Sequence, residues 1–238
     1  MFFSHSIDIW ERHPELVPGA LFVQGINKKA SVGAQVERLS AMATSRLANN
    51  TESELPEIQA WRAVFAKMGL KPTKYRCASE ALLRRLRKEN ALPRLHPLVD
   101  LCNAVSAAFA IPVAVFDVAK LSGDLEVRFA TGTETYETFS GEVEHPEPGE
   151  VIFADQAGKA HARRWTNRQS SLSAVSANTT SALIVAEALH DLASQDMRTL
   201  MAALMHEVAA AWPEAVAKAR VLTRSKARFE FPAAQVAR

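Results

Sequence analysis

The sequence predicts one domain of the α+β class, on three observations. Apolar residues recur at helical spacing in several segments up to residue 109 and again from residue 194. Between residues 112 and 189, short alternating or β-branched runs separated by Gly and Pro are typical of strands. Apolar residues make up 48% of the 238-residue chain, which is enough for a substantial hydrophobic core.

Composition limits the classes of protein and the cellular locations that we expect for this sequence. The chain has no run near the ~18 apolar residues of a membrane span, and its N-terminus lacks the basic and apolar regions of a signal peptide. Because Cys77 and Cys102 are its only cysteines, we expect neither a disulfide scaffold nor a structural zinc site, and we expect a cytoplasmic location. A net charge of +2 leaves nucleic-acid binding open, so local clusters of charge matter more.

Residues 1–74 are expected to add a strand and helices to the core. The run at 20–23 is bounded by Gly and Pro and predicts a short strand. Apolar spacing predicts helices over 31–47 and 55–68. In the second helix Trp61 belongs to an apolar stripe, which favours a core position over base stacking.

A basic segment follows at residues 71–90. Ser79 is a good N-cap for a helix over 80–88, which turns its leucines inward and most of its arginines and lysines outward. The charged face is either simply solvated or a contact surface for a phosphate backbone. On the second interpretation Arg76 and Arg84 are candidate RNA-binding residues.

The chain is organised around residues 96–117. Pro97 suits the first turn of a helix, and the apolar residues that follow recur at helical spacing. Pro112 then interrupts, and residues 112–118 predict a strand. At 100° per residue, Asn103 points about 120° away from the apolar stripe, so it is either solvated or placed for function.

Four further runs predict strands, at residues 125–130, 136–139, 151–155 and 181–189, and a turn-rich acidic stretch occupies 131–150. In the last run, alternation puts Val185 and Glu187 on one face among aliphatic neighbours. Glu187 is then either a carboxylate held in an apolar setting or a strand-end group in solvent.

A second basic cluster lies at residues 161–170. It interleaves arginines with an aromatic and an amide, namely Arg163, Arg164, Trp165, Asn167 and Arg168. This composition suits phosphates and a stacked base, and an exposed polar loop is the alternative.

Residues 191–220 are expected to be helical, and residues 221–238 to form an irregular tail. Ser194 caps an amphipathic helix, and Pro213 starts a further helical turn. Nowhere does the sequence show a phosphate-binding loop, a dinucleotide fingerprint, a zinc-ligand pair at recognised spacing or a nucleophile elbow. We therefore expect no metal, no cofactor and no covalent catalysis.

Three runs carry a resemblance to a known family: LVDLCN at 98–103, IPVAVFD at 111–117 and VIFAD at 151–155. In order and spacing they resemble the B3/B4 domain of the bacterial phenylalanyl-tRNA synthetase β subunit, which carries that enzyme's editing site. The resemblance covers residues 75–190 and implies a B3/B4-like β core with peripheral helices. The synthetase's other modules have no counterpart, so we expect a free-standing domain.

The resemblance also implies an amino-acid pocket. Asn103 and Cys102 match pocket positions, with Cys102 where the family has Thr, and Ala114 stands where the family has a histidine. Spacing from Asn103 places the family's pocket glutamate at Glu187, whereas a Thr-Thr signature places it at Val185. Asn103 and Glu187 are thus the candidate catalytic residues.

The loop at 163–168 departs from the family, which is glycine-rich there. Its larger side chains would fill space in the pocket. By this resemblance Trp165 and Asn167 would contact the substrate, with Trp165 stacked on the terminal adenine. Arg163, Arg164 and Arg168 would hold the terminal phosphates.

Two functions are compatible with these residues. One is a trans-acting aminoacyl-tRNA deacylase, because an aminoacyl ester is labile and a site needs only to hold it, orient a water and stabilise an oxyanion. The other is a non-catalytic module that binds RNA or a small molecule, because fold does not entail function. The expected partner is the aminoacylated acceptor end of a tRNA, with neither a membrane nor DNA.

Overall fold

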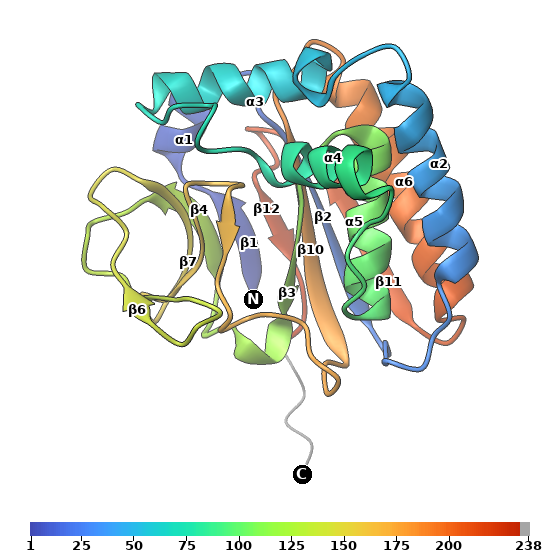
Figure 1. Cartoon of the computed structure of the whole chain (residues 1–238). Helices are drawn as coiled ribbons and strands as arrows, with labels where there is room; N and C mark the ends of the chain where they lie inside the picture. The colour runs from blue at the N-terminus through green and yellow to red at the C-terminus, as the bar shows by residue number, and fades with distance from the viewer. Residues whose placement is uncertain (234–238) are drawn as a thin grey trace.

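Two β-sheets packed against each other form the centre of the molecule, and helices cover the free face of the smaller one (Figure 1). The computed structural model describes residues 1–233. Helices and strands are mixed along the chain, so the α+β class predicted from the sequence is confirmed.

The smaller sheet has four antiparallel strands in the order β11-β2-β10-β3. Their bounds are Val216–Val221 for β11, Val17–Gln24 for β2, Ser181–Ala188 for β10 and Val113–Asp117 for β3. Every residue of β10 is buried, as expected for an inner strand covered on both faces. Because side chains alternate along a strand, Val185 and Glu187 face the second sheet while Ala186 faces the helices.

Helices α5 at Pro97–Phe109 and α6 at Ala193–Ala211 pack on the outer face of this sheet, and α2 at Gly33–Leu47 packs against α5 (Figure 1). Helix α6 approaches the sheet closely at Gly19 of β2, which lies opposite Ala186. A Cβ atom at Gly19 would lie 2.5 Å from the Sδ of Met201 and 2.6 Å from the Sδ of Met197. Only glycine fits there without displacing those buried side chains.

The second sheet has six strands in the order β12-β1-β4-β7-β8-β9. Their bounds are Arg228–Glu230 for β12, Phe2–His5 for β1, Leu125–Phe129 for β4, Val151–Asp155 for β7, Ala160–Arg163 for β8 and Arg168–Gln169 for β9. Aromatic rings join the two sheets: Phe116 of β3 lies 5.4 Å from Phe153 of β7, and Phe22 of β2 lies 6.0 Å from Phe231. A separate two-stranded ribbon comprises β5 (Tyr136–Glu137) and β6 (Val143–Glu144).

The remaining helices sit across one end of the sheets and on the outside of α5 (Figure 1). They are α1 at Ile7–Arg12, α3 at Pro56–Lys67 and α4 at Ala78–Glu89, with short 3-10 turns η1 at Glu52–Glu54 and η2 at Val118–Lys120. Among residues 1–233, no helix is both long enough and apolar enough to cross a membrane.

The C-terminal prediction was wrong. Residues 216–220, expected to be helical, form β11 together with residue 221, and residues 228–230 of the expected irregular tail form β12. The tail prediction for residues 234–238 lies outside the described residues. Alternating burial along β11 puts Ala217 and Ala219 inward, and pairing with β2 overrides the helical preference of an alanine-rich segment.

The N-terminal segment is also more central than expected. The predicted short strand at 20–23 is the eight-residue β2, and the first residues form β1 inside the larger sheet. Helix α4 begins at Ala78, with Cys77 at the N-cap position. The cap therefore lies two residues before Ser79, the predicted cap.

Helix α4 is held by a buried carboxylate. Glu80 is fully buried and accepts hydrogen bonds from the Nε (3.1 Å) and Nη2 (2.5 Å) of Arg62. The Nε of Arg76 lies 3.4 Å from the same carboxylate. By contrast, Glu89 pairs with Arg85 on the open face of the helix, where both side chains are exposed.

We predict that Glu80→Ala lowers the free energy of unfolding by about 2–3 kcal/mol, because it leaves two guanidinium groups without their buried partner. Glu89→Ala should change it by less than about 0.5 kcal/mol, since exposed ion pairs contribute little. Urea unfolding of both variants measures the difference. Equal losses would mean that the Glu80 pairs contribute no more than a surface pair.

Candidate functional site

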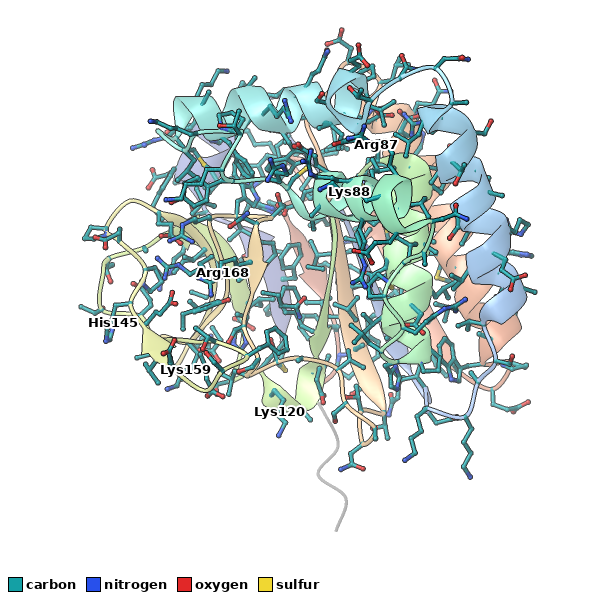
Figure 2. The ribbon with its side chains drawn as sticks, in the orientation of Figure 1. Arg87, Lys88, Lys120, His145, Lys159 and Arg168 are labelled. Carbon is teal, nitrogen blue, oxygen red and sulfur yellow. The ribbon has the colours of Figure 1, made fainter. Side chains whose placement is uncertain are left out.

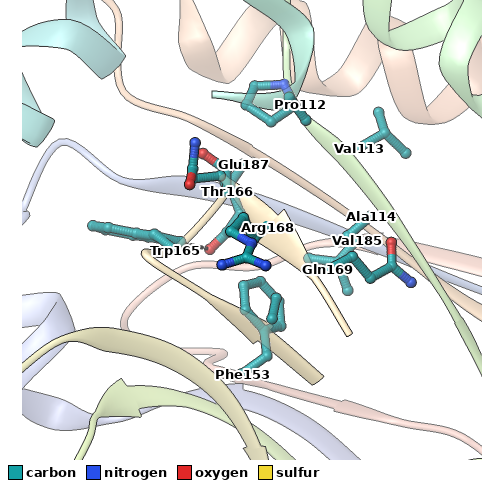
Figure 3. A pocket seen from close by; sticks show the side chains of 13 residues that line it. Pro112, Val113, Ala114, Phe153, Trp165, Thr166, Arg168, Gln169, Val185 and Glu187 are labelled. Atoms are coloured by element: carbon teal, nitrogen blue, oxygen red, sulfur yellow. Dashed lines mark hydrogen bonds between the residues drawn. The ribbon is translucent and has the colours of Figure 1, made fainter. Parts of the chain in front are cut away.

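A pocket opens where the edges of the two sheets meet (Figure 3). Residues 112–114 and β10 form one wall, and the turn at 165–169, Phe153 and Ala162 form the other. The cavity itself has a volume of about 70 Å³, below the range of drug-sized ligand sites, so it admits only a small group. Five of the residues predicted from the sequence line it together: Ala114, Trp165, Asn167, Arg168 and Glu187.

The polar centre of the pocket is the carboxylate of Glu187, which is only 2% exposed. Its Oε1 accepts a hydrogen bond from the Nε1 of Trp165 at 3.0 Å and lies 2.6 Å from the Nε2 of His5. Its Oε2 has no hydrogen-bond partner among residues 1–233 and is not fully enclosed. One oxygen is therefore bound within the protein, and the other is open to a ligand.

The wall beside Glu187 is apolar. Val185 lies two residues before Glu187 on the same face of β10, and Ala114 is its cross-strand neighbour on β3. Both candidates for the family's glutamate position, Glu187 and Val185, thus line the same pocket. Figure 3 shows Ala114 and Val185 on the side away from Trp165.

Two residues that hold Glu187 were not predicted from the sequence. His5 comes from β1, 182 residues before Glu187, and Trp61 of α3 donates from its Nε1 to the backbone oxygen of Glu187 at 3.3 Å. The sequence indicated a core position for Trp61, but no local pattern pairs either residue with a strand so far along the chain.

His13 also contacts this group of residues. The centre of its ring lies 4.8 Å from the centre of the Trp165 ring. It is 4% exposed, and its Nδ1 has no partner in the described part of the chain. Burial lowers the pKa of His13, although Glu15 and Glu187 act in the opposite direction. The folded protein therefore favours the neutral form of the His13 imidazole.

The turn after β8 directs Trp165 inward. Arg164 and Trp165 have φ angles of 48° and 58°, the left-handed region that costs a non-glycine residue ~1–2 kcal/mol. Trp165 is fully buried, with its ring 5.0 Å from that of Trp61. The predicted stacking of Trp165 on a terminal adenine is therefore wrong, because the ring faces are covered by the protein itself.

Arg163 is likewise directed inward. It is 4% exposed, its Nη2 lies 2.8 Å from Oε2 of Glu150, and its Nη1 pairs with Glu144. The Glu150 carboxylate raises the pKa of Arg163. The predicted phosphate contact at Arg163 is wrong, because two carboxylates already neutralise a guanidinium that is out of solvent.

The other two arginines of the cluster remain accessible in part. The guanidinium of Arg164 stacks over the ring of Tyr75 at 5.0 Å. Arg168 has a side chain 40% exposed, lies 3.4 Å from Glu144 and lines the pocket. Figure 3 shows Arg168 between Phe153 and Thr166, so it is the arginine of the cluster placed at the pocket.

The basic helix offers fewer free cations than predicted. Arg84 lies 3.2 Å from Oε1 of Glu52, Arg87 also pairs with that buried carboxylate, and Arg76 pairs with Glu80. Arg87 and Lys88 lie on α4 (Figure 2). The positive face of α4 is thus partly neutralised by carboxylates of η1 and of α4 itself.

Asn103 and Cys102 do not belong to this pocket. Both lie on α5, on the helical side of the four-stranded sheet, and neither is among the described residues that line the cavity. Cys102 is 1% exposed, and burial raises the pKa of its thiol. The prediction that Asn103 and Glu187 share one hollow is wrong, because β3 and β10 separate α5 from the Glu187 face.

Asn167 and Thr166 supply the neutral polar groups. Asn167 donates from its Nδ2 to the backbone oxygen of Arg76 at 2.8 Å, which ties the turn to the start of α4. The Oγ1 of Thr166 is enclosed and has no hydrogen-bond partner in residues 1–233. A bound molecule could satisfy that hydroxyl, since Thr166 lines the pocket.

Parts of the chain are similar to known proteins. A family model described as the B3/4 domain matches residues 60–204. The phenylalanine–tRNA ligase β subunits of Cereibacter sphaeroides and Shewanella oneidensis are 31% identical over 94 residues and 27% identical over 88 residues. These matches cover 40% and 37% of this chain but only 12% and 11% of the relatives.

The fold is similar to that of one solved structure, an N-terminal fragment of the phenylalanyl-tRNA synthetase β subunit from Pyrococcus horikoshii. It matches with a TM-score of 0.48 and 10% sequence identity, over 92% of this chain and 50% of that one.

We predict that Glu187→Ala lowers the free energy of unfolding by about 2–4 kcal/mol, because it leaves the buried Trp165 and His5 donors unpartnered. Glu187→Gln keeps an acceptor oxygen and should lose less. Chemical unfolding at neutral pH measures both. Wild-type stability in Glu187→Ala would show that the carboxylate does not hold the two sheets together.

A second prediction concerns pH. Because the folded state lowers the pKa of His13, protonation favours unfolding, and its contribution to stability is lost as pH falls below about 6.5. His13→Phe keeps a ring beside Trp165 and should flatten the stability profile between about pH 7.5 and 5.5. His145→Gln, at an exposed position, is the control and should keep the wild-type slope. Parallel profiles for all three proteins would contradict the role of His13.

Proposed function

The chain belongs to the B3/4 domain family, and from that premise we propose that it is a trans-acting aminoacyl-tRNA deacylase, which hydrolyses the ester of a mischarged tRNA at the Glu187 pocket. The observation that carries this proposal is a buried carboxylate in the pocket, beside an apolar wall, with one oxygen that has no partner among residues 1–233. A cationic group of matching size is the natural complement of such an oxygen.

The α-ammonium group of an aminoacyl ester fits this description. In the proposed complex it lies against Oε2 of Glu187, and the amino-acid side chain packs along Val185 and Ala114. Ala114 leaves open the space that a histidine fills in the resembled family. The proposed substrate is thus an aminoacyl ester whose amino-acid side chain packs against apolar residues.

The rim provides groups for the rest of the substrate. Arg168 offers a partly exposed guanidinium for a phosphate of the acceptor end. Arg164, whose guanidinium stacks on the ring of Tyr75, is a further candidate for such a contact. Arg163 is excluded from this role by its two internal partners.

Hydrolysis needs no protein nucleophile. A water molecule adds to the ester carbon, the bond to the ribose oxygen breaks, and the ribose hydroxyl and the free amino acid leave. Thr166 replaces Asn103 as the proposed polar group beside the carbonyl, because the residue lines the pocket and its enclosed Oγ1 has no partner among residues 1–233. Preorganised donors of this kind accelerate a reaction whose bond is already labile.

A non-catalytic role has one observation in its favour. Arg163 and Trp165, two of the residues expected to hold an acceptor end, are committed to contacts inside the protein. A module that binds the ammonium and side chain of a small molecule at Glu187 would need neither.

The test is ester loss from a panel of misacylated tRNAs, measured against spontaneous hydrolysis. We predict turnover by the wild-type protein and a loss of about tenfold or more in kcat/KM for Glu187→Gln. Arg168→Ala should raise KM and weaken the salt dependence of binding, since a phosphate contact is lost.

Arg85→Ala is the matched control for Arg168→Ala, because Arg85 is an exposed, paired arginine remote from the pocket. It should leave both constants unchanged. Binding of tRNA without ester loss on any substrate would reject the enzyme and support the binding module.

A further inference from the structure

Three potential metal ligands meet on the side of the molecule where α3, the end of β10 and the start of α6 come together. They are Glu57 of α3, His190 just after β10, and Asp196 in the first turn of α6, and one donor atom from each lies within 4.8 Å of the others. They line a groove that is separate from the Glu187 pocket. Its space is about 830 Å³ when the part open to solvent is included.

Internal hydrogen bonds account for only part of this arrangement. The side chain of Glu57 is only 9% exposed, yet its Oε2 has no partner among residues 1–233. The Nε2 of His190 lies 2.8 Å from Oδ2 of Asp196, but the Nδ1 of the same ring is enclosed and also without a partner. Unpartnered buried acceptors are costly, and a bound cation would supply the missing partner of Oε2 of Glu57.

A neighbouring arginine already holds one of the proposed ligands in position. The Nη2 of Arg46 donates to Oε1 of Glu57 at 2.6 Å, which fixes the carboxylate and leaves Oε2 free. Two carboxylates against one guanidinium leave the cluster with a net negative charge when His190 is neutral.

We propose that Glu57, His190 and Asp196 bind one divalent cation of the zinc class. One imidazole nitrogen with two carboxylates is a borderline donor set, which favours Zn²⁺ over Mg²⁺ or Ca²⁺. Three protein ligands leave a coordination position open toward the groove. This replaces the expectation of no metal, which rested on ligand spacing, because 133 positions separate Glu57 from His190.

The site would also strengthen the support of the Glu187 pocket. Trp61, one helical turn after Glu57 on α3, donates to the backbone oxygen of Glu187, and His190 follows that strand by two residues. A cation at this point would tie α3 to β10 and α6. Its presence does not depend on the proposed deacylase activity.

The test uses the full chain, stripped with a chelator and titrated with ZnCl₂ by calorimetry. We expect one Zn²⁺ per chain, a rise in Tm, and no comparable effect of MgCl₂. Glu57→Gln and Asp196→Asn should each lower the Zn²⁺ affinity by about 100-fold or more, since even outer-shell changes cost 10–100-fold. Co²⁺ should give a visible absorption band that both substitutions abolish.

Asp191→Asn is the matched control, because Asp191 lines the same groove but is not one of the three ligands. It should keep wild-type affinity. Circular dichroism checks folding, and if Glu57→Gln does not fold, Asp196→Asn decides, since Asp196 is 31% exposed. Absence of Zn²⁺ binding, or binding that neither substitution weakens, would overturn the proposal.

Discussion

The hydrogen bonds of the Glu187 carboxylate are the constraint on which the rest of the structure depends. A carboxylate out of water must have partners, or its burial costs several kcal/mol. Those partners come from β1 through His5 and from the turn after β8 through Trp165, while Trp61 of α3 holds the adjoining backbone. Three segments distant in sequence are thereby tied to one residue of β10.

The same interaction shapes the pocket. Trp165 reaches Glu187 only because the turn adopts left-handed backbone angles at Arg164 and Trp165, a cost that burial of the indole ring offsets. The turn then presents Thr166 and Arg168 to the cavity. One carboxylate oxygen is held within the fold and the other is open in the pocket, so the proposed recognition would use the same side chain that stabilises the structure.

The Glu57 cluster lies at the other side of the same contact between α3 and β10. There, too, one carboxylate oxygen is held by an arginine, and the second has no partner in the described part of the chain. Helix α3 carries both Glu57 and Trp61, and Trp61 donates to the backbone of Glu187, so this helix connects the two sites. An ion at one site would stiffen the backbone that positions the other.

The sequence by itself determined most of the elements and the face on which Glu187 lies, because periodicity is a local property that burial imposes residue by residue. It also carried the family resemblance, through runs in β3, α5 and β7. Only the tertiary structure decided that Asn103 is remote from the pocket, that Arg163 is neutralised, and that β11 pairs with β2. These outcomes depend on partners far along the chain, and the energy of a buried charge or an unpaired strand is set by what lies beside it in space.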